Sequence, residues 1–200
     1  MSSNISNNNR TKIDSIYHLF KTISEYSVPV MGYIILIMTA FIGIEVIIRK
    51  FFALSLTGVE EFSGYSMAII SVWGFSYTLI NKGHIRIDFF YRLLSNNHLK
   101  RLLDIISIVS MIVFVSPLTY FAYRVFSRSW ARLSKANTSL ATPLWIPQVV
   151  WFAGFLLFLI LIILIFIKLV VHLAKKEYQE AEEVYGLKDE VQEELDLQNK

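Results

Sequence analysis

Few residues of this chain could do chemistry on a substrate. It contains no cysteine, so thiolate metal sites, thiol nucleophiles and disulfides are excluded. None of its four histidines (His18, His84, His98 and His172) lies in the middle of a long apolar segment, where the axial ligands of a b-haem would have to lie. The sequence also has no Gly-rich phosphate-binding loop and no HExxH zinc motif. We therefore expect a protein that is not an enzyme, holds no metal or cofactor, and does not anchor a redox complex.

Glu45 is the most suggestive ionisable residue, because it is a carboxylate within a long apolar segment. An acid in such a position is a candidate for proton coupling, which raises the hypothesis of a stand-alone proton-coupled exporter. A structural explanation competes with it, because Arg49 follows by four residues, in the order that favours an ion pair along a helix. Glu45 also lies near the end of its segment, where a charge costs less than at the membrane centre. We favour the ion pair over the exporter.

Four apolar blocks determine the fold class. Hydrophobic residues make up 54% of the 200 residues, above the ~45–50% usual in soluble domains. Each block approaches or exceeds the ~20 residues that a helix needs to cross the hydrocarbon core of a bilayer. Strands of a membrane barrel would be shorter and would alternate in polarity, and no other structure satisfies its backbone hydrogen bonds in lipid. We predict an all-α membrane protein with four transmembrane helices, at about 26–48, 62–80, 103–123 and 144–167.

The two ends of the chain differ from this transmembrane domain, which we place at residues 26–171. Residues 1–25 begin with a polar stretch and continue with apolar residues at helical spacing, which predicts an amphipathic helix on the membrane surface. The alternative is an ordinary extension of the first span. Residues 172–200 are rich in acids and form an acidic cytoplasmic tail, either solvated or partly an amphipathic helix.

The segment between the second and third blocks predicts a short helix of its own. At 100° per residue its large apolar side chains cover one broad arc, and most of its charged residues cover the other. Such a helix would lie in the membrane interface as an arm, with its basic residues among phospholipid headgroups. The residues that we expect to build this arm or to contact headgroups are His84, Arg86, Asp88, Phe89, Phe90 and Arg92.

Lys and Arg residues predict the orientation. Thirteen of them flank the blocks on the side that both termini share, and six lie on the other side. Basic residues concentrate on the cytoplasmic side of membrane proteins, so we place both termini in the cytoplasm. A nucleic-acid partner is not expected, because the basic residues flank apolar blocks and form no separate basic domain.

The second block carries small residues in helical stripes, and small residues let helices approach closely. Part of this face should therefore meet other helices, within the chain or in a partner protein. The residues assigned to this packing are Gly64, Tyr65, Ala68, Ser71, Trp73 and Gly74. A second group of charged residues should gather at the outer ends of the first two spans, and it consists of Glu45, Arg49, Glu60 and Glu61.

The segment Gly83-His84-Ile85-Arg86-Ile87-Asp88 resembles the G-H-I-R-V-D signature of the DctQ family, the small membrane subunits of TRAP transporters. Its place after the second of four spans fits that family. Other features agree, namely Glu60-Glu61 before the second span, Trp73-Gly74 within it, and the proline-bounded segment 143–147 that opens the fourth. The resemblance covers roughly residues 25–170.

The resemblance implies a tripartite system. A periplasmic binding protein captures an organic acid, and a large DctM-like membrane subunit moves it inward with a sodium gradient. The small subunit pairs with the large one and enlarges its scaffold against the bilayer, without binding the acid or the sodium itself. Sialic acid, a C4-dicarboxylate or a related sugar acid are the substrates that this family suggests, and this chain has little reason to encode the choice.

Overall fold

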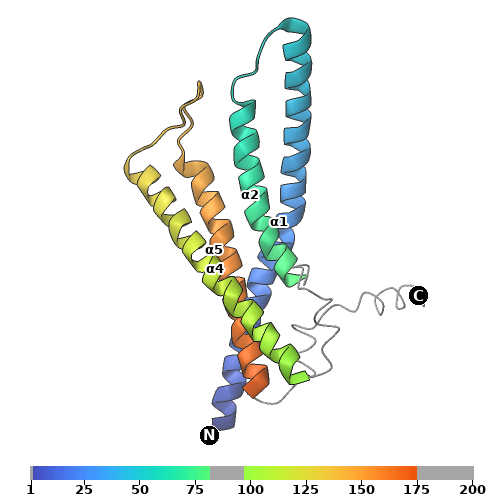
Figure 1. Cartoon of the computed structure of the whole chain (residues 1–200), viewed down its shortest axis with the longest axis vertical. Helices are drawn as coiled ribbons and strands as arrows, with labels where there is room; N and C mark the ends of the chain where they lie inside the picture. The colour runs from blue at the N-terminus through green and yellow to red at the C-terminus, as the bar shows by residue number, and fades with distance from the viewer. Residues whose placement is uncertain (1, 82–96, 175–200) are drawn as a thin grey trace, which may run out of the picture.

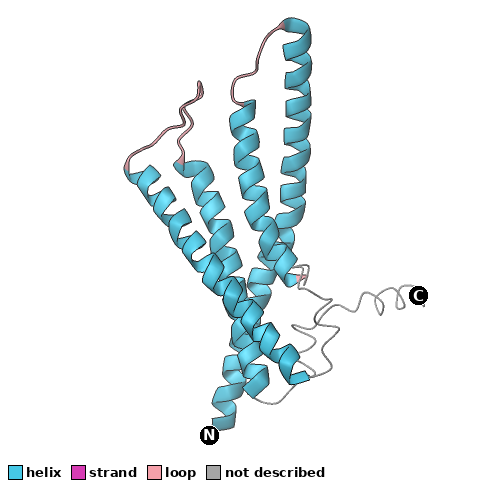
Figure 2. Cartoon of the chain, viewed as in Figure 1, coloured by secondary structure: helices cyan, strands magenta, loops and turns pink. Residues whose placement is uncertain are grey.

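Four long helices make up the computed structural model, which describes residues 2–81 and 97–174. These helices are α1 (Ser2–Phe52), α2 (Val59–Ile80), α4 (Asn97–Ala131) and α5 (Trp145–Ala174). No β-strand occurs in these two ranges (Figure 2). The predicted all-α fold is therefore confirmed. The predicted arm helix and acidic tail lie outside the described residues, except for the tail's first three positions, which continue α5.

The helices form two hairpins. Figure 1 shows α1 and α2 side by side, and α4 and α5 side by side, with the two pairs diverging toward one end of the bundle. That end carries the α1–α2 loop (53–58) and the α4–α5 loop (132–144), and we call it the loop end. α2 and the first part of α1 both contact α5, so α5 touches every other described helix.

Three of the described helices, α1, α4 and α5, have segments long and apolar enough to cross a membrane: Asp14–Phe52, Leu102–Ala131 and Trp145–Val171. α2 has 22 residues interrupted by Ser, Gly, Thr and Tyr, and it is not among these three helices. The transmembrane placement of α2 therefore stays a prediction. A helix that is less apolar than its neighbours is suited to lie against protein rather than lipid.

The region predicted as a surface helix is continuous with the first span, and its placement on the membrane surface stays a prediction. α1 runs without a break for 51 residues, about 75 Å, so this region extends the first span. One side of this region contacts α5. The Lys168 ammonium lies 2.7 Å from an Asp14 carboxylate oxygen and 4.2 Å from the centre of the Tyr17 ring. Ser24, two turns further along, is fully buried. α5 thus covers part of this amphipathic region, while Ile16, Leu19 and Ile23 stay exposed.

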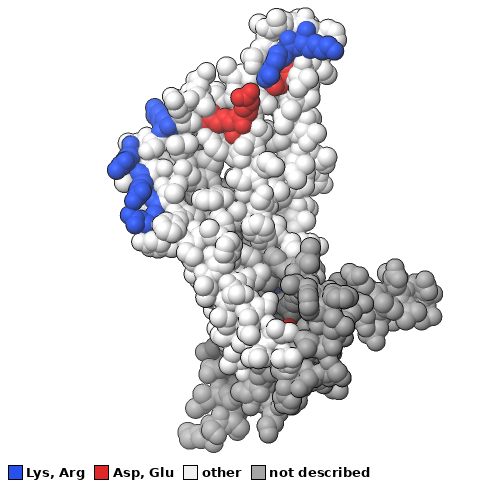
Figure 3. Space-filling model, in the orientation of Figure 1, with Lys and Arg blue, Asp and Glu red and all other residues white. Residues whose placement is uncertain are grey.

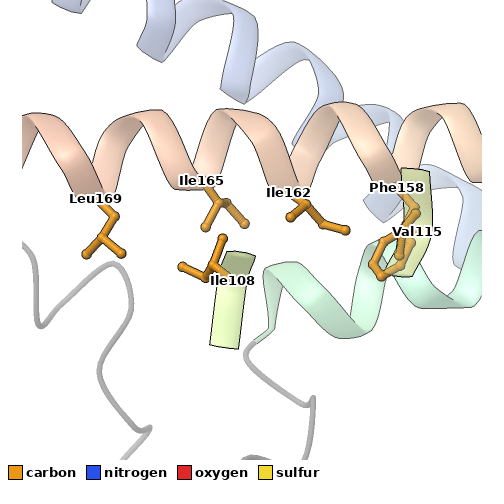
Figure 4. Packing of buried hydrophobic residues seen from close by; sticks show 6 residues of the cluster. All are labelled: Ile108, Val115, Phe158, Ile162, Ile165 and Leu169. Carbon is orange, nitrogen blue, oxygen red and sulfur yellow. The ribbon is translucent and has the colours of Figure 1, made fainter. Parts of the chain in front are cut away.

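The apolar core lies between α4 and α5. Ile108 and Val115 of α4 face a row of α5 side chains spaced by three and four residues, as Figure 4 shows. That row consists of Phe158, Ile162, Ile165 and Leu169. The adjacent Leu161 and Ile162 are completely inaccessible. Because α5 is covered on several sides, it is the element against which the others are positioned.

Candidate packing face of α2 and polar clusters at the loop end

α2 has an inward and an outward face. Val59, Val72 and Ser76 are buried inside the chain. Four residues at spacings of three and four are exposed, and we call them the outward stripe: Gly64, Met67, Ala68 and Ser71. Residues at these spacings share one side of a helix, so the small side chains predicted for packing at positions 64, 68 and 71 do lie together and face away from the other described helices.

The small residues of the outward stripe leave room for a second helix, and the Ser71 hydroxyl already has a hydrogen-bond partner in its own helix. A Cβ added to Gly64 would meet nothing within 4 Å. The Ser71 hydroxyl donates a 2.8 Å hydrogen bond to the Met67 carbonyl of its own helix. A second helix could therefore approach this stripe closely without supplying a polar partner, which is how small residues favour helix association in membranes.

Trp73, in contrast, faces α5 within the chain. Its indole N–H donates a 3.0 Å hydrogen bond to the Val150 carbonyl. Gly154 makes room for the ring, since a Cβ there would lie 2.8 Å from Trp73 Cδ1. The sequence analysis did not single out Gly154, although a lone glycine inside an apolar helix is a signal of close packing. Gly74 has open space at its Cβ position.

Glu45 and Arg49 form the ion pair expected from their spacing, at the loop end of α1. The Glu45 side chain is only 6% exposed, and the Ser55 hydroxyl donates to it over 3.4 Å. The Arg49 guanidinium also lies 3.9 Å from Glu60, whose side chain is 91% exposed. These contacts join α1 to the loop that follows it and to the first turn of α2. They stabilise a helix hairpin and leave the acid without the open approach that a proton carrier needs.

Glu61 links α2 to the α4–α5 loop. Its carboxylate accepts a 2.8 Å hydrogen bond from the Tyr65 hydroxyl and another from Thr138, 77 residues further along. The Thr138 hydrogen bond is the main cause that lowers the pKa of this carboxyl, which lies just before the predicted second span. Hydrogen bonds to the ionised form have this effect. Tyr65, predicted for packing against a partner, therefore also orients an acid of its own helix.

Leu140 and Gly58 add an apolar contact to this link. Gly58 has a positive φ of 99°, which a side chain would strain. A Cβ there would also overlap the Leu140 side chain at 2.1 Å. The α4–α5 loop is held in a hairpin-like turn by a 2.9 Å hydrogen bond from the Ala136 N–H to the Thr142 carbonyl. The two hairpins of helices are thus joined at the loop end.

The remaining predicted site residues belong to the arm, and they lie outside the described residues: His84, Arg86, Asp88, Phe89, Phe90 and Arg92. Within the described ranges, no group of three His, Asp or Glu residues is arranged to hold a metal ion.

Comparison with known proteins gives one match. A family model described as "Tripartite ATP-independent periplasmic transporters, DctQ component" matches residues 38–172, which is more than half of the chain. No curated protein and no solved structure was found to match.

Replacing Gly154 with alanine should loosen the contact between α2 and α5. The new Cβ would lie 2.8 Å from Trp73 Cδ1 and 2.9 Å from Val72 Cγ1, and overpacking of this kind costs about 1–3 kcal/mol. We expect a lower midpoint of thermal unfolding for purified G154A. The matched control is G74A on α2, where a Cβ meets nothing within 4 Å and the midpoint should not fall. Equal midpoints for G154A and the wild type would contradict the close packing of Trp73 on α5.

Replacing Glu61 with glutamine should loosen the α4–α5 loop. A carboxyl with a lowered pKa stabilises the folded contact above its ordinary value of 4.5, and this contribution is lost as the pH falls through the lowered value. At pH 7 we expect faster amide hydrogen exchange in residues 134–144 of E61Q than of the wild type. The difference should shrink well below pH 4.5, where both side chains are neutral.

The neighbouring acid provides the control. Glu60 is highly exposed and makes only the long contact with Arg49, so E60Q should leave exchange in this loop unchanged. Equal exchange of the loop in E61Q and E60Q at pH 7 would show that Glu61 does not hold it.

Proposed function

The chain belongs to the DctQ component family of the tripartite ATP-independent periplasmic transporters, and we propose that it pairs with a large DctM-like membrane subunit. In this proposal it has no catalytic role. It stabilises the scaffold of the large subunit during sodium-driven uptake of an organic acid, which a periplasmic binding protein delivers. The acid would be sialic acid, a C4-dicarboxylate or a related sugar acid, recognised by the other two proteins.

The observation that carries the proposal is the outward stripe of α2. Gly64, Ala68 and Ser71 are small, exposed and aligned, and Ser, Gly, Thr and Tyr interrupt the apolar sequence of α2. Lipid gives little reason for such a surface, because small residues reduce contact with acyl chains. A helix of another protein would gain van der Waals contact at close range. This supports a protein partner on this side of α2.

The polar side chains support a scaffold rather than a transport pathway. Glu45 is paired with Arg49, Glu61 with Tyr65 and Thr138, and Lys168 with Asp14. Each pair joins two parts of this chain or two turns of one helix. Their distribution over both ends of the bundle suits a rigid body whose shape matters more than its chemistry.

The orientation and the arm complete the proposal. We place both termini in the cytoplasm of a bacterial inner membrane, so that the loop end faces the periplasm. The arm, with His84, Arg86 and Asp88 near its start, would run along the cytoplasmic surface among phospholipid headgroups and hold the scaffold of the large subunit in place.

Filling the outward stripe should weaken the pairing. We expect G64L/S71L to reduce co-purification with the co-expressed large subunit by about tenfold, because two bulky side chains would prevent close helix approach. The matched control is S110L on α4, since Ser110 is also exposed and its hydroxyl also bonds its own helix, to the Ser107 carbonyl at 2.8 Å. S110L should co-purify normally. Undiminished recovery of the large subunit with G64L/S71L would remove α2 from the interface.

The exporter hypothesis makes the opposite prediction about Glu45. We expect the purified chain in proteoliposomes to move no organic acid under a sodium or proton gradient, and the chain with its large subunit and binding protein to do so. E45Q should leave the sodium dependence of that uptake unchanged and lower the thermal stability of the subunit, because it removes one charge of a buried pair. Solute movement by the isolated chain, abolished in E45Q, would instead establish an exporter.

A further inference from the structure

A row of three arginines lies at the loop end of α4. Arg124 and Arg128 lie in α4 and Arg132 is the first residue after it; they follow one another at intervals of four residues and are all exposed. Residues at this spacing lie on one side of a helix, and eight residues correspond to about 12 Å along its axis. We call this row the arginine ladder. Figure 3 shows basic side chains on this flank of the molecule, separated from the acidic side chains near the start of α2.

The arginine ladder has no acidic partner within the described part of the chain. The ion pairs found there at this end of the bundle involve Arg49 with Glu45 and Glu60. Arg124 instead places its guanidinium 5.9 Å from the centre of the Tyr120 ring, one turn toward the middle of α4. Several uncompensated positive charges on one flank require counterions or an anionic ligand.

The same side of α4 is apolar between the arginine ladder and the middle of the helix. Val113, Phe114 and Phe121 are exposed by 67%, 69% and 59%. At 100° per residue, Val113 and Phe114 lie on either side of the line through Arg124 and Arg128, and Phe121 lies beside it. Along one face, the surface thus changes from large apolar side chains to cations within about one helical turn. An acyl chain followed by a phosphate has the same order of properties.

We propose that the arginine ladder binds the phosphate groups of anionic phospholipids, whose acyl chains lie along the apolar surface beneath it. Guanidinium groups form two parallel hydrogen bonds with phosphate oxygens, and each basic residue near an anionic lipid surface contributes to binding. Tyr120 and Trp130 are both exposed nearby, and aromatic side chains prefer this depth of the membrane. The site is distinct from the arm and does not depend on which leaflet the loop end faces.

An acidic protein is the competing occupant, and the geometry favours lipid. Arg124 and Arg128 lie within α4 and continue its exposed apolar side, so they project from the flank of the bundle. A protein that docks on the loop end from the aqueous phase would first meet the loops at 53–58 and 132–144. Lipid lies against the flank in any membrane.

Native mass spectrometry of the full chain tests the proposal. The purified protein is equilibrated in detergent with dioleoyl phosphatidylglycerol or, separately, with dioleoyl phosphatidylcholine. We expect R124Q/R128Q to retain about tenfold less phosphatidylglycerol than the wild type, with no change in phosphatidylcholine. The control K50Q/K135Q removes the same charge from two exposed lysines at the same end, and should lose less than about twofold.

R124K/R128K separates geometry from charge and guards against misfolding of the glutamine variant. Lysine keeps the charge but not the paired hydrogen bonds, so an intermediate loss of phosphatidylglycerol is expected. Three results would overturn the proposal. The first is full phosphatidylglycerol retention by R124Q/R128Q, and the second is an equal loss of phosphatidylglycerol in R124Q/R128Q and K50Q/K135Q. The third is unchanged lipid retention by R124Q/R128Q together with lost co-purification of the large subunit. The last would identify a protein-binding surface.

Discussion

Helices in a bilayer gain little from apolar contact with one another, because lipid tails are as apolar as leucine. Their association depends on close fit and on hydrogen bonds or ion pairs, and this constraint explains where the contacts of this chain lie. Gly154 lets the Trp73 ring approach α5, and the indole N–H then reaches a backbone carbonyl. Where the chain makes no such close contact between helices, as along the outward stripe of α2, its surface stays uncovered.

Polar contacts at the two ends complement this central fit. Lys168 holds the first part of α1 against α5 at one end, through Asp14 and the Tyr17 ring. At the loop end, Glu61 connects α2 to the α4–α5 loop through Thr138. Charges near the membrane surface cost less than charges at its centre, so the ends are where polar links between helices can form at low cost. The two hairpins become one body because each end has such a link.

The positions of the helices could be predicted from the sequence, because length and apolar content in lipid leave few alternatives. The ion pair between Glu45 and Arg49 could also be predicted, because both residues lie in one helix, four positions apart. Contacts between helices were harder to predict. The spacing of apolar residues predicted an amphipathic helix at residues 11–25. Its contact with α5 could not be predicted, because it depends on Lys168, more than 140 residues away. For the same reason Trp73 was assigned to a partner, although its own α5 supplies the hydrogen-bond acceptor. The arm lies outside the described residues and stays a prediction.

The distribution of covered and uncovered surface in the described residues agrees with the proposal that this chain does not select the solute. Selecting a small acid requires several polar groups that converge on one point and remain free to bind it. Here the buried Glu45 is engaged by Arg49 and Ser55, and the two acceptor oxygens of Glu61 are taken by Tyr65 and Thr138. Among the described residues, exposed side chains include small ones on α2, which recognise shape, and arginines on α4, which recognise charge. A helix surface and a phosphate suit these two properties. Under the proposed function, such a subunit would act through its fit to a neighbour and to the bilayer, and would leave the choice of solute to the other components.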